Sequence, residues 1–87
     1  MNAQTKMQQM IEQFRQNCQI LAVLKESSHD LAQVSIGIIL NRMVYGYKKI
    51  HKLSLLNTKD ANIKKLVGFM YTYNVYDDLR GILSYWM

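Results

Sequence analysis

The sequence contains no proline and a single cysteine, Cys18. The absence of proline means that no position has a fixed φ or lacks a backbone donor, so nothing of that kind interrupts a long helix. One thiol excludes an intramolecular disulfide framework, and the fold must depend on its hydrophobic core. Hydrophobic residues make up 49% of the 87-residue chain, enough for one small core and a single domain, residues 1–87.

We also expect no secretory leader, and the sequence has no long apolar run. Its first ten residues, MNAQTKMQQM, have neither the basic segment nor the apolar segment of a signal peptide. The most apolar stretch, residues 34–40, is far shorter than the roughly 20 residues that span a bilayer. We therefore expect a cytoplasmic protein without a transmembrane segment.

The spacing of apolar residues predicts an all-α fold, a small antiparallel bundle of about four helices. Three patterns of a capping residue followed three positions later by an acid indicate helix starts at Ser27, Asn57 and Asn74. The β-branched run at residues 34–39 is also compatible with a strand, but Gly37 and the long periodic flanks favour a helix. The predicted helices span residues 5–25, 28–52, 58–73 and 75–86.

Helical periodicity also predicts which side chains form the core. In the first helix they are Met7, Met10, Ile11, Phe14, Cys18, Leu21 and Leu24. In the second they are Ile36, Ile39, Leu40, Met43, Tyr47 and Ile50. In the last two they are Ile63, Leu66, Val67 and Met70, then Leu79, Ile82, Leu83 and Trp86. Between the second and third helices, Leu53, Leu55 and Leu56 are predicted to form an apolar loop on the core.

Part of the first helix has heptad spacing, which is compatible with a coiled-coil seam as well as with a core-facing amphipathic helix. The candidate residues for self-association are Met7, Met10, Phe14 and Leu21.

The second helix carries a further stripe that changes character along its length. It begins as Leu31, Val34 and Ile38 and continues along the same side as Arg42, Tyr45, Lys49 and Lys52. This pattern predicts that the first half of the helix is buried on two sides and that the second half exposes a basic surface.

The positive charge is concentrated in residues 42–65. Seven Lys and Arg residues against Asp60 give this segment a charge of +6, while the whole chain carries +5. Lysines early in the helix at 58–73 are not favoured by the helix dipole, so local helix stability does not explain them. A solvated face and an anion-binding or partner-binding surface are both compatible with the charge. The candidate binding residues are Arg42, Tyr45, Lys48, Lys49, Lys52, Lys59, Lys64 and Lys65.

Residues suited to catalysis or metal binding are few and scattered. Cys18, His29 and His51 are too far apart in sequence to form a known metal-ligand spacing, and Cys18 falls on an apolar stripe. The adjacent Asp77 and Asp78 fit the first turn of a helix, where acids are favoured by the dipole. The four glycines are isolated and form no phosphate-binding loop. We therefore expect no enzymatic activity, no metal and no cofactor.

These observations favour a non-enzymatic helical protein that acts by binding another protein, as a regulator, adaptor or inhibitor, and that forms a homodimer or other oligomer. The small core, the six methionines and the aromatic residues near the C-terminus support this hypothesis. The alternative is a nucleic-acid-binding regulator that uses the basic 42–65 surface. A third hypothesis is an immunity-type or membrane-surface protein, although the glutamine-rich first helix does not resemble an interfacial anchor.

Overall fold

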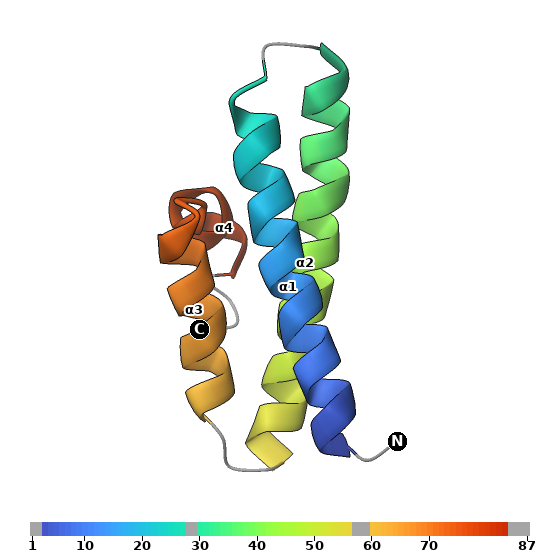
Figure 1. Ribbon diagram of the computed structural model, residues 1–87, viewed down its shortest axis with the longest axis vertical. Coiled ribbons are helices and arrows are strands. Elements are labelled where there is room, and N and C mark those ends of the chain that lie inside the picture. The colour runs from blue at the N-terminus through green and yellow to red at the C-terminus, as the bar shows by residue number, and fades with distance from the viewer. Residues whose placement is uncertain (1–2, 28–29, 57–59, 84–87) are drawn as a thin grey trace.

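The computed structural model describes residues 3–27, 30–56 and 60–83, and over these residues it contains four α-helices and no strand. The all-α prediction is therefore confirmed. The helices are α1 (Ala3–Lys25), α2 (Asp30–Leu56), α3 (Asp60–Thr72) and α4 (Tyr76–Leu83). In Figure 1, α1 and α2 form a long hairpin, α3 lies along one side of its lower half, and the short α4 follows beside the middle of the hairpin.

Helix α2 continues four residues beyond its predicted end. The segment Leu53–Leu56 was predicted as a loop, and this prediction was wrong, since the structure keeps it helical to Leu56. Leu53 lies one turn after the buried Ile50 and is itself half-buried against the core. No proline or glycine interrupts this stretch, so the helical periodicity simply continues. The predicted helix starts near residues 28 and 58, including the cap Asn57, and the end near Trp86 lie outside the described residues.

The core is a single cluster to which all four helices contribute. Its buried side chains are Met7, Ile11, Phe14, Cys18 and Leu21 from α1, Ile39, Met43, Tyr47 and Ile50 from α2, Leu66 and Met70 from α3, then Val75 and Leu79. Every one of these except Val75 was predicted from periodicity, so the main faces of the helices are confirmed. Met10, Leu24, Ile36, Leu40, Ile63 and Val67 pack against the same cluster and are partly buried.

The turn between α3 and α4 differs from its prediction. Asn74 was predicted to cap the start of the fourth helix, but its φ is 57°, whereas an N-cap residue has an extended backbone. Its N–H donates to the Tyr71 carbonyl at 3.1 Å, and the N–H of Val75 donates to the Met70 carbonyl at 2.8 Å. This pair of bonds is the Schellman motif, so Asn74 ends α3. Val75 and Met70 are both fully buried, as the motif's hydrophobic contact requires.

Two basic side chains of α1 tie the later part of the chain to the hairpin. Arg15 donates to the Glu12 carboxylate and, through Nη1, to the Tyr73 hydroxyl at 2.9 Å. The Arg15 hydrogen bond holds the pKa of Glu12 below its ordinary value. Lys25 Nζ lies 2.6 Å from Asp78 Oδ2 and donates to the Asn74 carbonyl at 2.8 Å. These contacts fix the α3–α4 turn against α1.

Candidate interaction surface

The first half of the second α2 stripe is exposed. Leu31, Val34 and Ile38 have 77%, 64% and 48% of their surface accessible, so the prediction that this half of the helix is buried on two sides was wrong. The reason is that the stripe lies on a side of α2 that α3 and α4 do not cover, since Arg42, Tyr45 and Lys49 further along the same stripe are exposed too. The main face of α2 still packs on α1, but no other described element covers the second stripe there.

The adjoining end of α1 adds two more exposed apolar side chains. Ile20 is 44% exposed and Val23 is 67% exposed. Together with Leu31, Val34 and Ile38 they form what we call the tip patch. Several large apolar side chains exposed at one end of a molecule mark a site of protein contact more often than a single one does.

The second half of the same stripe lines a groove between α1 and α2. Met10, Gln13, Phe14 and Asn17 line it from α1, and Arg42, Tyr45, Gly46 and Lys49 line it from α2. Gly46 leaves space in this wall, since a Cβ built there meets no atom within 4 Å. Phe14 and Met10 give the groove an apolar lining, and two cations lie along its α2 side.

Three of the predicted binding residues therefore lie together. Tyr45 is 66% exposed, and the Nζ of Lys49 lies 5.5 Å from the centroid of its ring. This cation–π contact holds an aromatic surface and a positive charge side by side. Arg42, one turn before Tyr45, is exposed at the same groove.

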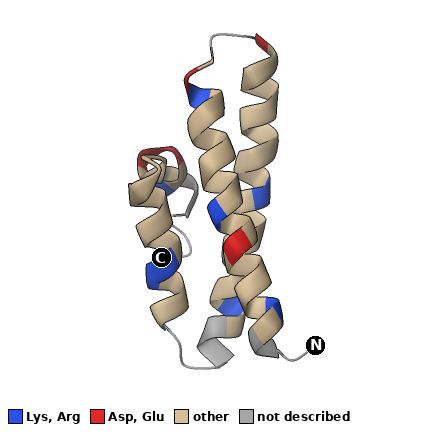
Figure 2. Ribbon diagram, viewed as in Figure 1, with Lys and Arg blue, Asp and Glu red and all other residues tan. Residues whose placement is uncertain are grey.

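The other predicted basic residues are exposed but do not line this groove. Lys48 and Lys52 are exposed on α2, and Lys64 and Lys65 are exposed on α3. Figure 2 shows the blue segments of α2 and α3 in the middle and lower part of the molecule, with red segments at the hairpin tip, on α4 and in the middle of α1. Lys59 lies outside the described residues.

The residues predicted for self-association are mostly buried in the chain's own core. Phe14 is 2% exposed, Leu21 is fully buried and Met7 is 9% exposed. Met10 alone of the four is partly exposed, at the groove. The heptad spacing thus reflects packing of α1 against α2 and α3, and these side chains offer little surface to a second molecule.

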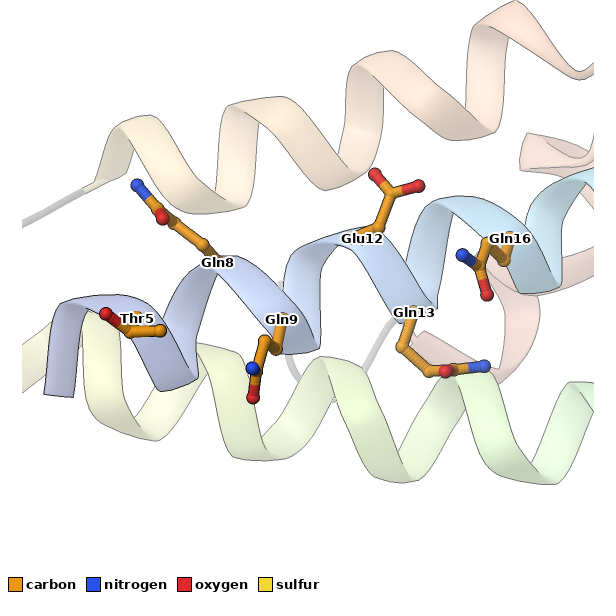
Figure 3. Close-up of a pocket in the computed structure, with 6 residues that line it drawn as sticks. All are labelled: Thr5, Gln8, Gln9, Glu12, Gln13 and Gln16. Atoms are coloured by element: carbon orange, nitrogen blue, oxygen red, sulfur yellow. The ribbon is translucent and has the colours of Figure 1, made fainter. Parts of the chain in front are cut away.

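A second hollow lies along α1 and is polar. Figure 3 shows its lining side chains, which all belong to this one helix and splay outward from it. They are Thr5, Gln8, Gln9, Glu12, Gln13 and Gln16. A small-molecule site needs polar groups that point toward one ligand from several sides. The side chains of a single helix point away from one another, so this hollow is not such a site.

The structure describes two of the three candidate metal ligands. Cys18 is fully buried, and burial raises the pKa of its thiol to about 12, which keeps it protonated and unreactive. His51 is half-buried with its ring stacked on Tyr47 at 6.1 Å between centroids. His29 lies outside the described residues. Within the part of the chain that the structure describes, no three His, Cys, Asp or Glu side chains are grouped to hold an ion.

The tip patch was missed although the sequence contains a signal for it. Leu31, Val34 and Ile38 share their side of α2 with Arg42 and Lys49, as the stripe already indicated. A straight helix that exposes one end of a stripe exposes the other end too, unless another element covers it. In this chain, the basic half of the stripe was therefore the indication that the apolar half is exposed.

Comparisons of the chain with models of known protein families, with curated proteins and with solved structures gave no match. None of the helices, over the residues described, has an apolar stretch long enough to cross a membrane.

Proposed function

We propose that this chain acts by binding a protein through one side of the α1–α2 hairpin. The observation that supports this function is the continuous exposed stripe of α2, apolar at Leu31, Val34 and Ile38 and aromatic and basic at Arg42, Tyr45 and Lys49. Exposed aliphatic side chains next to a tyrosine and an arginine match the composition of protein interfaces, in which Tyr and Arg are enriched.

The rest of the surface supports a binding role over a catalytic one. The groove has one buried neutral amide, Asn17, and cations at its edge, with no paired acid and base. The chain's one thiol, that of Cys18, is enclosed in the core. Binding energy would come from covering the tip patch, and the cations would set the orientation and charge preference of the partner.

A photo-crosslinking experiment tests this proposal with a matched pair of sites. A photo-reactive phenylalanine analogue replaces either Leu31 or Gln33 in protein produced in its own cells. Both residues are exposed, but two positions along a helix place them on nearly opposite sides. We expect discrete protein adducts from position 31 and none from position 33. Equal adducts at both sites, or none at position 31, would contradict a binding role for this face.

A second candidate function is binding of nucleic acid by the basic lower half of the molecule. Lys48, Lys49, Lys52, Lys64 and Lys65 are all exposed there, which favours this candidate. Their replacement by glutamine should abolish binding to mixed-sequence DNA or RNA, and wild-type affinity should fall with salt by a slope of about 0.9 per duplex phosphate contacted. Absence of binding to duplex DNA, single-stranded DNA and RNA at low salt would exclude this function.

A further inference from the structure

The exposed stripe of α2 has a symmetric spacing about Ile38. Leu31 and Tyr45 each lie seven residues from Ile38, and Val34 and Arg42 each lie four residues from it. All five side chains are exposed. Ile38, in the middle, has 48% of its surface accessible. Because positions three, four and seven apart share one side of a helix, the five form a single row of about 21 Å.

Because the row is symmetric about Ile38, it can pack on the same row of a second copy that runs in the opposite direction. In a two-fold interface, residue i contacts residue j and residue j contacts residue i. With Ile38 on the axis, Leu31 lies against the Tyr45 ring of the second copy, and Val34 lies against the aliphatic stem of Arg42. Each aliphatic side chain at the tip thereby gains a partner with a large apolar surface.

The charges at the two ends of the row favour the same direction. Glu26 and Asp30 are exposed at the hairpin tip, while Arg42 and Lys49 are exposed in the other half of the molecule. An antiparallel arrangement places the acids of one copy beside the cations of the other at both ends. A parallel arrangement would instead place Arg42 and Lys49 against their own equivalents, and like charges repel.

We propose that the chain forms a two-fold symmetric homodimer in which α2 packs antiparallel on α2 of a second copy, with Ile38 at the axis. This inference rests on the proposed protein-binding function and names the partner. The two hairpins would form a four-helix assembly, and the tip patch of each would be covered by the groove side of the other. Leu21 takes no part in it, because it is fully buried within each copy.

Sedimentation of the purified protein tests the assembly. Wild type should sediment as a dimer at high micromolar concentration and dissociate on dilution, and Ile38→Glu should remain a monomer because two carboxylates would meet at the axis. Gln33→Glu adds the same charge on the opposite side of α2 and should dimerise as wild type does. A wild type that is monomeric throughout, or a Gln33→Glu variant as impaired as Ile38→Glu, would overturn the proposal.

Disulfide trapping tests the register and direction in a Cys18→Ala background. Ile38→Cys should cross-link with itself on mild oxidation. Leu31→Cys alone and Tyr45→Cys alone should not, since equivalent residues are about 21 Å apart along the antiparallel pair and a disulfide needs Cα atoms within about 7 Å. A mixture of Leu31→Cys and Tyr45→Cys chains should give the heterodimer. Self-cross-linking of Leu31→Cys would show a parallel pair and overturn the proposal.

These experiments separate the dimer from the broader function. If the purified protein is monomeric but position 31 photo-crosslinks to a different protein, the homodimer is wrong and the protein-binding function stands. If position 31 gives no adduct of any kind, both are wrong. If the adduct has the mass of two copies of this chain and the cysteine pairs behave as expected, both are supported.

Discussion

Asn74 ends α3 with a left-handed backbone, and the identity of this one residue determines how the chain turns toward α4. Its φ of 57° is strained for most side chains, whereas asparagine and glycine tolerate it. The local sequence N-V-Y-D also fits an N-cap followed by a first-turn acid, which is why the residue was assigned to the wrong helix end. Burial of Val75 favours the role of Asn74 as the C-terminal cap of α3 over the role of N-cap of α4. The chain must turn toward the core immediately after Asn74 for Val75 to be buried.

Substitutions at Asn74 distinguish a C-terminal cap from an N-terminal cap. We expect Asn74→Gly to leave the free energy of unfolding unchanged or raise it, since glycine adopts positive φ without strain. Asn74→Ser should lower it by about 1 kcal/mol, because serine lacks asparagine's tolerance of this region. Urea denaturation provides the comparison. An N-cap would give the reverse order, with serine equivalent to asparagine and glycine less stable.

The buried thiol of Cys18 makes stability depend on alkaline pH. Burial raises its pKa from the ordinary 9.0 to about 12, so the folded state holds the proton more tightly than the unfolded state does. Its contribution is therefore complete below pH 9 and is lost as pH rises from 9 to about 12. We expect the urea midpoint to fall over this window and to fall less steeply in Cys18→Ala. Identical pH profiles for the two proteins would contradict this assignment; the tyrosines, present in both, serve as the internal control.

At the scale of the elements, α4 is the least anchored helix. It spans Tyr76–Leu83, presents Leu79 to the core and contacts α2 and α3. Lys25, at the end of α1, joins both Asp78 and the Asn74 carbonyl, and thus holds the start of α4 from the other side. Stacking of Tyr76 on Tyr71, with 4.4 Å between ring centroids, adds a further link across the turn.

Removal of the Lys25 charge should loosen α4 selectively. We expect Lys25→Met to lower global stability by at most about 1 kcal/mol, as for other partly exposed ion pairs. Amide hydrogen exchange should become faster at Asp77–Arg80 while the core amides of α1 and α2 keep their protection. Lys6→Met, which removes an exposed lysine of the same helix, is the control and should change neither. An even loss of protection along the chain would contradict a local role for Lys25.

At the scale of the whole molecule, a long hairpin is only partly covered by the two shorter helices that follow it. Helices α1 and α2 contain 23 and 27 residues, whereas α3 and α4 contain 13 and 8. The extents of the Cα trace, 41 × 27 × 19 Å, show the resulting elongation. The tip patch lies at the end of the hairpin, and the α2 stripe that begins there stays exposed as far as Lys49 because α3 and α4 do not cover that side of α2.

Two identical substitutions show the difference between the core and the tip patch. Leu21→Ala should lower the free energy of unfolding by about 2–5 kcal/mol, because Leu21 is fully buried and its loss leaves a cavity. Leu31→Ala, at a residue 77% exposed, should change it by about 0.5 kcal/mol or less in the monomer. Thermal and urea denaturation at low protein concentration measure both. Comparable losses would show that the tip patch is packed within the chain.

The sequence by itself determined the helices and the faces that form the core. Met7, Phe14 and Leu21 on α1, and Met43 and Ile50 on α2, recur with the period of a helix, and burial of such a stripe is a local property of the pattern. It also placed Arg42, Tyr45 and Lys49 on one exposed side of α2, where the structure has them.

Only the tertiary structure decided which further faces are covered. The stripe of Leu31, Val34 and Ile38 is apolar enough to be buried, and periodicity cannot tell whether a neighbour reaches it. That depends on which side of the hairpin α3 and α4 occupy, and their position follows from long-range contacts, such as those of Arg15 with Tyr73 and Lys25 with Asp78. Coverage of a helix face is a property of distances between elements, which a one-dimensional pattern does not contain.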